Sequence, residues 1–160
     1  MRPVLLLLLA GCAARHARTS DALEGRYVPG TPKDSAWTAQ KPGGADYAWW
    51  NATLGSSLYT DSNCGVRFED TSLSVLVNRL FAGIADRRDV DERDLMIGGR
   101  GALYRARQGT LDGAPIEVGA VVMKRDSCTY DFVLIAHPDV YEAAAPALWE
   151  VVEGFSLEAR

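Results

Sequence analysis

Apolar and polar residues alternate along the chain with two periods, and these periods predict its strands and helices. Residues 46–51 and 57–63 are rich in Trp, Tyr, Leu and Thr, and a glycine-containing stretch separates them, which is typical of a β-hairpin. From Leu73 to Ile84 the apolar residues fall at i, i+3, i+4, i+7, i+8 and i+11. This single stripe predicts an amphipathic helix, which Asp70, Thr71 or Ser72 can cap.

Residues 100–108 and 116–125 predict a second hairpin around Asp112-Gly113. A two-residue turn would pair Tyr104 with Val121, whereas a three-residue turn would pair Tyr104 with Ala120. We expect the three-residue turn, because it gathers the apolar residues on one face. That face would hold Ala102, Tyr104, Ala106, Ile116, Val118, Ala120 and Val122, and the other would hold Arg105, Arg107 and Glu117.

Residues 128–136 predict a further strand, with Cys128, Tyr130, Phe132 and Leu134 on one face. His137-Pro138-Asp139 then opens a last helix with a broad apolar side, in which Pro146 predicts a kink or a later start. The predicted order of elements is a hairpin, a helix, three strands and a helix. This order indicates an α+β fold, because it lacks the βαβ alternation of an α/β fold. We expect a single domain over residues 45–160, an antiparallel sheet of about five strands with two helices packed on it.

The first eleven residues have the composition of an export signal. Arg2 precedes a leucine-rich run that ends at Ala10, which is too short to cross a bilayer as a helix. Leu9-Ala10-Gly11-Cys12 resembles the lipobox of bacterial lipoproteins at all four positions. The resemblance implies a signal peptide over residues 1–11 and a lipid anchor, palmitate included, on Cys12. Because Ala13 is not an aspartate, it also implies the outer membrane facing the periplasm.

Residues 12–44 predict a flexible tether and an irregular approach to the domain. Residues 13–20 lack apolar periodicity, and the turn signals Pro29-Gly30 and Pro42-Gly43-Gly44 follow, with Trp37 between them. The net charge of the 160 residues is −4, and the basic pairs Arg87-Arg88 and Lys124-Arg125 are isolated from each other and form no basic patch in the sequence. This distribution argues against nucleic acid as a partner, and no motif points to a cofactor.

Once Cys12 carries a lipid, Cys64 and Cys128 remain as an even pair in an oxidising compartment. A structural disulfide is the favoured interpretation, and two buried thiols or a redox or metal pair are the alternatives. A catalytic dithiol usually has the C-x-x-C spacing, and a zinc site needs more ligands than this chain offers.

Candidate catalytic and metal-binding residues are few. A hydrolase would have to be centred on His137, with Asp131 or Asp139 orienting it, but no G-x-S-x-G motif accompanies them. The acidic stretch of residues 89–94 could ligate calcium, yet it lacks the glycine and the distal glutamate of an EF-hand loop. We interpret this stretch as a solvated connection between helix and sheet, and we expect no metal site.

Trp49 and Trp50 are the one pair that suggests a binding surface. Neighbouring residues of a strand point to opposite faces, so one of the two indoles belongs to the core and the other points outward. The outward indole is covered either by the tether or by a ligand or partner.

Residues 73–157 resemble the small PsbP-like α+β domains of bacterial lipoproteins. The resemblance lies in the helix that ends near Ile84, in Gly98-Gly99-Arg100-Gly101-Ala102 with the Asp112-Gly113 hairpin, and in the closing stretch of residues 148–155. It implies a non-enzymatic binding or accessory role, carries over no catalytic residue and suggests an envelope protein as partner. A small envelope hydrolase or ligand-processing enzyme centred on His137 is the alternative.

Overall fold

Seven antiparallel strands form the main sheet of this protein in a computed structural model that describes residues 26–157. Their order across the sheet is β2-β3-β4-β8-β7-β6-β5. The strands are β2 (Trp37–Gln40), β3 (Tyr47–Asn51), β4 (Ser56–Cys64), β5 (Ala85–Ile97), β6 (Arg100–Leu111), β7 (Ala114–Arg125) and β8 (Cys128–Ala136). The predicted α+β class is confirmed, but the sheet is larger than the five strands that the sequence suggested.

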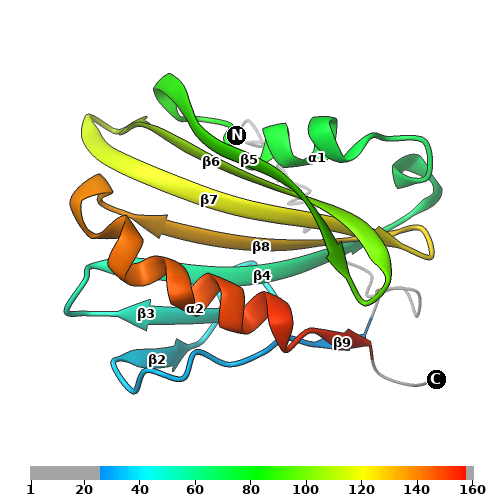
Figure 1. Cartoon of the computed structure of the whole chain (residues 1–160), viewed down its shortest axis with the longest axis horizontal. Coiled ribbons are helices and arrows are strands. Elements are labelled where there is room, and N and C mark those ends of the chain that lie inside the picture. Colours follow the sequence, from blue (N-terminus) through cyan, green and yellow to red (C-terminus); the bar gives the residue numbers. More distant parts are fainter. Residues whose placement is uncertain (1–25, 158–160) are drawn as a thin grey trace, which may run out of the picture.

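Two helices cover opposite faces of this sheet. Helix α2 (Tyr141–Glu153) lies in front of β8 and β4 in Figure 1, and the shorter α1 (Leu73–Arg79) packs against β6 and β7. Because side chains alternate between the two faces of a strand, each central strand contributes side chains to two separate hydrophobic cores. On β8, Phe132 packs in the α2 core and Val133 in the α1 core, and each is at most 1% exposed.

The two helices begin at polar residues that the sequence marks. The Ser72 hydroxyl accepts a hydrogen bond from the backbone N–H of Val75 and caps α1. His137 caps the 3-10 turn of residues 138–140 that leads into α2. Helix α2 runs through Pro146, so the later start that this residue suggested is not found.

The acidic stretch of residues 89–94 is largely exposed, as expected, but it belongs to a strand and is not a connection between helix and sheet. Strand β5 spans 13 residues, and its acidic side chains meet arginines of β6. Asp89 lies opposite Arg107 and pairs with it, and Glu92 lies opposite Arg105 and accepts from its Nε at 2.6 Å. Strand pairing therefore neutralises a charge pattern that, read alone, is typical of a solvated loop.

The turn between β6 and β7 is also different from the prediction. It has two residues, Asp112 and Gly113, and it pairs Tyr104 with Val121 instead of Ala120. Both turn residues have positive φ (50° and 81°), which suits a two-residue hairpin. The apolar-face rule failed because helices cover both faces of this sheet. Arg105, on the face assigned to solvent, is only 7% exposed.

Two strands precede residue 45, in the segment that the sequence predicted to be irregular. Strand β1 (Tyr27–Val28) pairs with β9 (Ser156–Leu157), and β2 extends the main sheet beside β3. Trp37 of β2 is 8% exposed and joins the α2 core, as does Tyr27. The resulting edge beyond β3 forms one side of the site described next.

Candidate binding site

Trp49 and Trp50 point to opposite faces of β3, in agreement with the alternation rule. Trp49 lies in the α2 core and is 7% exposed, whereas Trp50 is 41% exposed on the face that carries α1. The outward indole stands beside Ser57 of β4 and Thr38 of β2, which are its partners in register. Its neighbourhood is therefore fixed by three strands of the sheet.

An open cavity of about 620 Å³ lies around Trp50. The residues that line it come from β2, β3, β4 and the loop between β2 and β3. They are Gln40, Gly43, Gly44, Ala45, Ala48, Trp49, Trp50, Ser57, Leu58, Tyr59 and Asp61. Their surface is mainly apolar, with a few polar groups at the edges, which is the usual make-up of a ligand-binding site.

The cavity exists because α1 is short and covers only part of its face. Its seven residues pack against β6 and β7, while Tyr59 of β4 forms the border of the α1 core. Beyond Tyr59, the side chains of Ala48 and Trp50 continue the apolar surface. Within residues 26–157, no helix covers this part of the sheet.

Two carboxyl groups meet at the border of the cavity. Asp61 of β4 lines it and lies directly opposite Asp131 of β8 in the strand register. Burial, and then the charge of Asp61, raise the pKa of Asp131 to about 7. Burial and both carboxylates also raise the pKa of Tyr59 to about 12. Asp61 accepts a hydrogen bond from the Asn63 amide at 3.1 Å.

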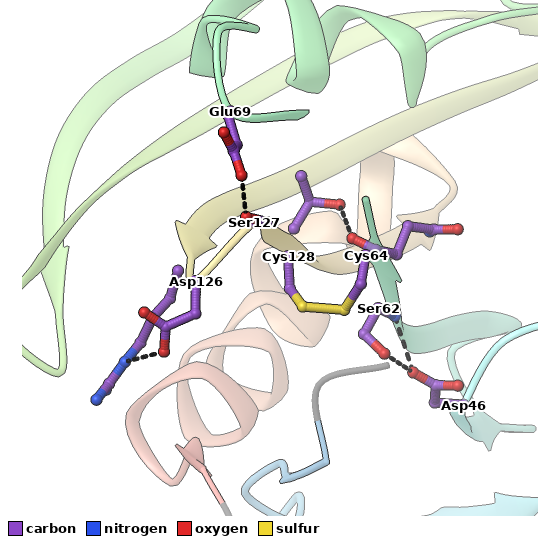
Figure 2. Close-up of a disulfide and its surroundings, with 10 residues drawn as sticks. Asp46, Ser62, Cys64, Glu69, Asp126, Ser127 and Cys128 are labelled. Carbon is purple, nitrogen blue, oxygen red and sulfur yellow. Dashed lines mark hydrogen bonds and ion pairs between the residues drawn. A yellow bond between two sulfur atoms is a disulfide. The ribbon is translucent and has the colours of Figure 1, made fainter. Parts of the chain in front are cut away.

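The structure contains the disulfide expected from the cysteine count. Cys64 at the end of β4 and Cys128 at the start of β8 are opposite in register, with their Cα atoms 4.0 Å apart. Figure 2 shows this bridge and polar contacts around it. Asp46 accepts from the Ser62 hydroxyl at 2.8 Å, and Ser127 donates to Glu69. The disulfide thus joins β4 and β8 at the strand end nearest the two carboxyl groups.

Of the two aspartates that could orient His137 in the hydrolase alternative, Asp139 lies beside it, whereas Asp131 lies in the middle of β8 and His137 follows the end of that strand. Five residues separate Asp131 from His137, and six steps along an extended strand span about 20 Å. His137 Nδ1 accepts from the backbone N–H of Asp139 at 3.2 Å and lies 3.5 Å from its carboxylate. These contacts fit the capping role of His137, and the absence of an enzymatic activity stays a prediction.

The remaining sequence predictions concern metals and membrane attachment. Within the described residues, no three His, Cys, Asp or Glu side chains gather where they could hold a metal ion. No helix in the same part of the chain is long and apolar enough to span a membrane. Cys12 and the rest of the lipobox lie outside the described residues, so the lipid anchor stays a prediction.

The Asp61–Asp131 pair is a feature that sequence reasoning missed. The signal was present, since both residues lie in segments that were predicted to be strands. Their contact depends on β4 pairing with β8, although 69 residues separate the aspartates in the chain (131 minus 61, less one). A register fixed at Cys64–Cys128 would place them opposite each other, because each lies three residues from its cysteine.

No protein-family model and no curated protein sequence matches the chain. Solved structures do resemble it. LpqN of Mycobacterium tuberculosis, involved in cell envelope biogenesis, is 11% identical with a TM-score of 0.63, over 84% of this chain and 86% of LpqN. Cyanobacterial PsbP (CyanoP) of Synechocystis sp. PCC 6803 is 12% identical with a TM-score of 0.53, over 78% and 83%. PA94 of Pseudomonas aeruginosa, of unknown function, is 16% identical with a TM-score of 0.51, over 78% and 81%. At these identities the likeness concerns the fold, and this chain shares the α+β fold of these proteins, CyanoP included.

Proposed function

We propose that this protein is a lipid-anchored lipoprotein of the bacterial cell envelope that binds a protein partner and has no enzymatic activity. The observation that carries the binding role is the open cavity around Trp50, an apolar surface with a large exposed aromatic ring. Aromatic side chains at exposed, partly enclosed positions are the typical anchors of protein interfaces.

The anchor and the location rest on the lipobox. Leu9-Ala10-Gly11-Cys12 places a lipid on Cys12, and the outer membrane facing the periplasm is the proposed destination. The fold shared with LpqN, which takes part in cell envelope biogenesis, supports an accessory role in the envelope. The Cys64–Cys128 disulfide supports an oxidising compartment.

Metabolic labelling with palmitate tests the anchor. We expect label on the wild-type chain and none on a Cys12→Ala variant. The variant should also be absent from the membrane fraction. Equal labelling of both chains would contradict the proposed attachment.

Photo-crosslinking in cells tests the binding role. A photoreactive benzoylphenylalanine is placed at position 50 or, as a control, at position 96 on the β5–β6 hairpin, where Met96 is 71% exposed. We expect a discrete crosslinked protein at position 50 only. The absence of a product at position 50, or identical products at both positions, would contradict the proposed surface.

A further inference from the structure

The two edge strands of the main sheet differ in how they are protected against pairing with another chain. Strand β5 carries eight charged residues and pairs with β6 through two register shifts. Charges and bulges of this kind keep an edge strand from accepting a further strand. Strand β2, with the sequence Trp-Thr-Ala-Gln, has no charged residue and pairs with β3 without a shift. Figure 1 shows β2 at the border of the sheet, and within residues 26–157 no strand pairs with its outer side.

The backbone of Ala39 faces this outer side of β2. Opposite residues of an antiparallel pair alternate between hydrogen-bonded and non-hydrogen-bonded, with Cα atoms about 5.5 Å and about 4.5 Å apart, respectively. Cys64 and Cys128 are a register pair with Cα atoms 4.0 Å apart, so theirs is a non-hydrogen-bonded pair. Leu58, six residues before Cys64 in an unshifted register, therefore also turns its backbone groups away from β8 and toward β3. They bond to Trp49, its partner in register, and Trp49 has none left for Ala39.

A hydrogen bond at the start of β2 leads to the same result. The backbone N–H of Trp37 donates to the carbonyl oxygen of Asp34 at 3.1 Å, and Asp34 lies outside the sheet. Trp37 therefore turns its backbone groups away from β3, and Ala39, two residues later, does the same. Thr38, Ala39 and Gln40 are exposed. Ala39 thus presents an accessible N–H donor and C=O acceptor that the described strands do not use.

The cavity around Trp50 lies on one face of this edge. Register partners share a face, so Thr38 lies beside Trp50 and Gln40 beside Ala48 on the face that carries α1. Gln40, Ala48 and Trp50 line the cavity, which therefore reaches the edge strand. In a strand added beside β2, the residue opposite Ala39 points its side chain to the α2 face, and its two neighbours point theirs to the cavity face. The mainly apolar lining favours apolar side chains at those two positions.

We propose that the protein partner adds an extended segment to β2 as a further antiparallel strand. One residue of the segment exchanges both backbone hydrogen bonds with Ala39, and the apolar side chains on either side of it lie on the cavity face. This inference rests on the proposed binding role and names how the partner is held. The partner segment is therefore an extended stretch with apolar residues at alternate positions, and not an amphipathic helix.

Hydrogen exchange of backbone amides tests the geometry in the protein alone. In the full chain in detergent solution, we expect the Ala39 amide to exchange about tenfold faster than the amides of Thr38 and Gln40, which bond to β3. Slow exchange of the Ala39 amide would show that its N–H is already bonded within this chain, and would overturn the proposal.

A short peptide supplies a defined probe of strand pairing. Acetyl-Thr-Leu-Thr-Leu-Thr-amide places its leucines on the cavity face when its central threonine lies opposite Ala39. The matched control peptide has an N-methyl group on that threonine, which removes one donor N–H and leaves every side chain in place. We expect the unmodified peptide to bind about tenfold more tightly, to slow the exchange of the Ala39 amide and to shift the indole N–H resonance of Trp50.

Proline variants test the same bond from the side of the protein. Ala39→Pro removes the outward N–H and no bond to β3, so the fold should be kept and binding of the unmodified peptide should weaken about tenfold. Val90→Pro is the matched control, because Val90 is an exposed residue at a register shift of β5, the opposite edge of the sheet. We expect wild-type circular dichroism from both variants and wild-type peptide binding from Val90→Pro. The N-methylated peptide needs no variant, so it tests the proposal even if Ala39→Pro fails to fold.

The outcomes separate this inference from the proposed function. Equal affinity of the two peptides would overturn strand addition, even if crosslinking at position 50 still captures a partner. Concentration-dependent dimerisation of the chain that Ala39→Pro abolishes would overturn it in favour of a second copy at β2. Failure of crosslinking at position 50 counts against the protein-binding role itself, whatever the peptides do.

Discussion

The partly buried carboxyl of Asp131 predicts an unusual dependence of stability on pH. Burial and the neighbouring Asp61 raise its pKa to about 7 in the folded protein. In the unfolded chain an aspartate titrates near 3.9. The folded state therefore binds an additional proton between about pH 4 and pH 7. The free energy of unfolding should fall as the pH rises through this window and become level above it.

The magnitude follows from the size of the shift. A difference of about three pH units corresponds to roughly 4 kcal/mol, at about 1.4 kcal/mol per unit. This is a large part of the 5–15 kcal/mol by which folded domains are typically stable. An Asp131→Asn variant cannot ionise and keeps nearly the same shape. We expect it to match the wild type near pH 4 and to exceed its free energy of unfolding by up to roughly 4 kcal/mol at pH 8.

Urea unfolding followed by tryptophan fluorescence at each pH unit from 4 to 8 measures this difference. The difference between wild type and variant isolates Asp131, because the other titrating groups are common to both chains. Asp94→Asn, which changes an exposed aspartate of β5, is the matched control and should show no such trend. A difference that stays constant across the pH range, or a variant less stable than wild type at pH 8, would refute the reasoning.

Three further predictions follow from packing and covalent geometry. In urea unfolding, Trp49→Ala should lower the free energy of unfolding by about 3–5 kcal/mol and Trp50→Ala by a clearly smaller amount, since Trp49 is 7% exposed and Trp50 is 41% exposed; equal losses would contradict this. Cys64→Ser should lose about 4 kcal/mol by the chain-entropy model, and wild type under dithiothreitol should show a comparable loss. Gly119→Ala should lower the free energy of unfolding by about 1–3 kcal/mol, because the new Cβ would lie 1.8 Å from the Tyr141 hydroxyl oxygen. In a double-mutant cycle, Tyr141→Phe should relieve part of this loss, and strictly additive losses would contradict the proposed clash.

The pattern of apolar and polar residues predicted those elements that have one apolar face or a polar capping residue at one end. The apolar stripe from Leu73 and the cap at Ser72 locate the start of α1, and the alternation from Cys128 to Leu134 correctly groups the β8 residues that pack in the α2 core. Patterning failed for β5, because its eight charged residues show no apolar face. Its charges are balanced by β6, and that pairing becomes visible only once the strands are side by side.

The candidate site was predicted in part. That one of Trp49 and Trp50 points outward follows from strand geometry alone, and the structure assigns this position to Trp50. The pairing of Asp61 with Asp131 at the border of the cavity could not be predicted from strand geometry alone. Each aspartate alone is a polar residue in a strand, and their interaction arises from the pairing of β4 with β8.

By itself, the sequence predicted the α+β class, the start of both helices and, as the favoured interpretation, the pairing of Cys64 with Cys128, whereas the first helix ends at Arg79 instead of near Ile84. These features depend on residues near in the chain, or on a cysteine count with few solutions. The tertiary structure alone decided the seven-strand order, the turn at Asp112-Gly113 and the cavity around Trp50. The strand order depends on pairing between segments far apart in the chain, such as β4 with β8. The turn and the cavity depend on which faces of the sheet the helices cover, and α1 is too short to cover the strands at Trp50. Burial is a property of the assembled layers, so the periodicity of one segment cannot specify it.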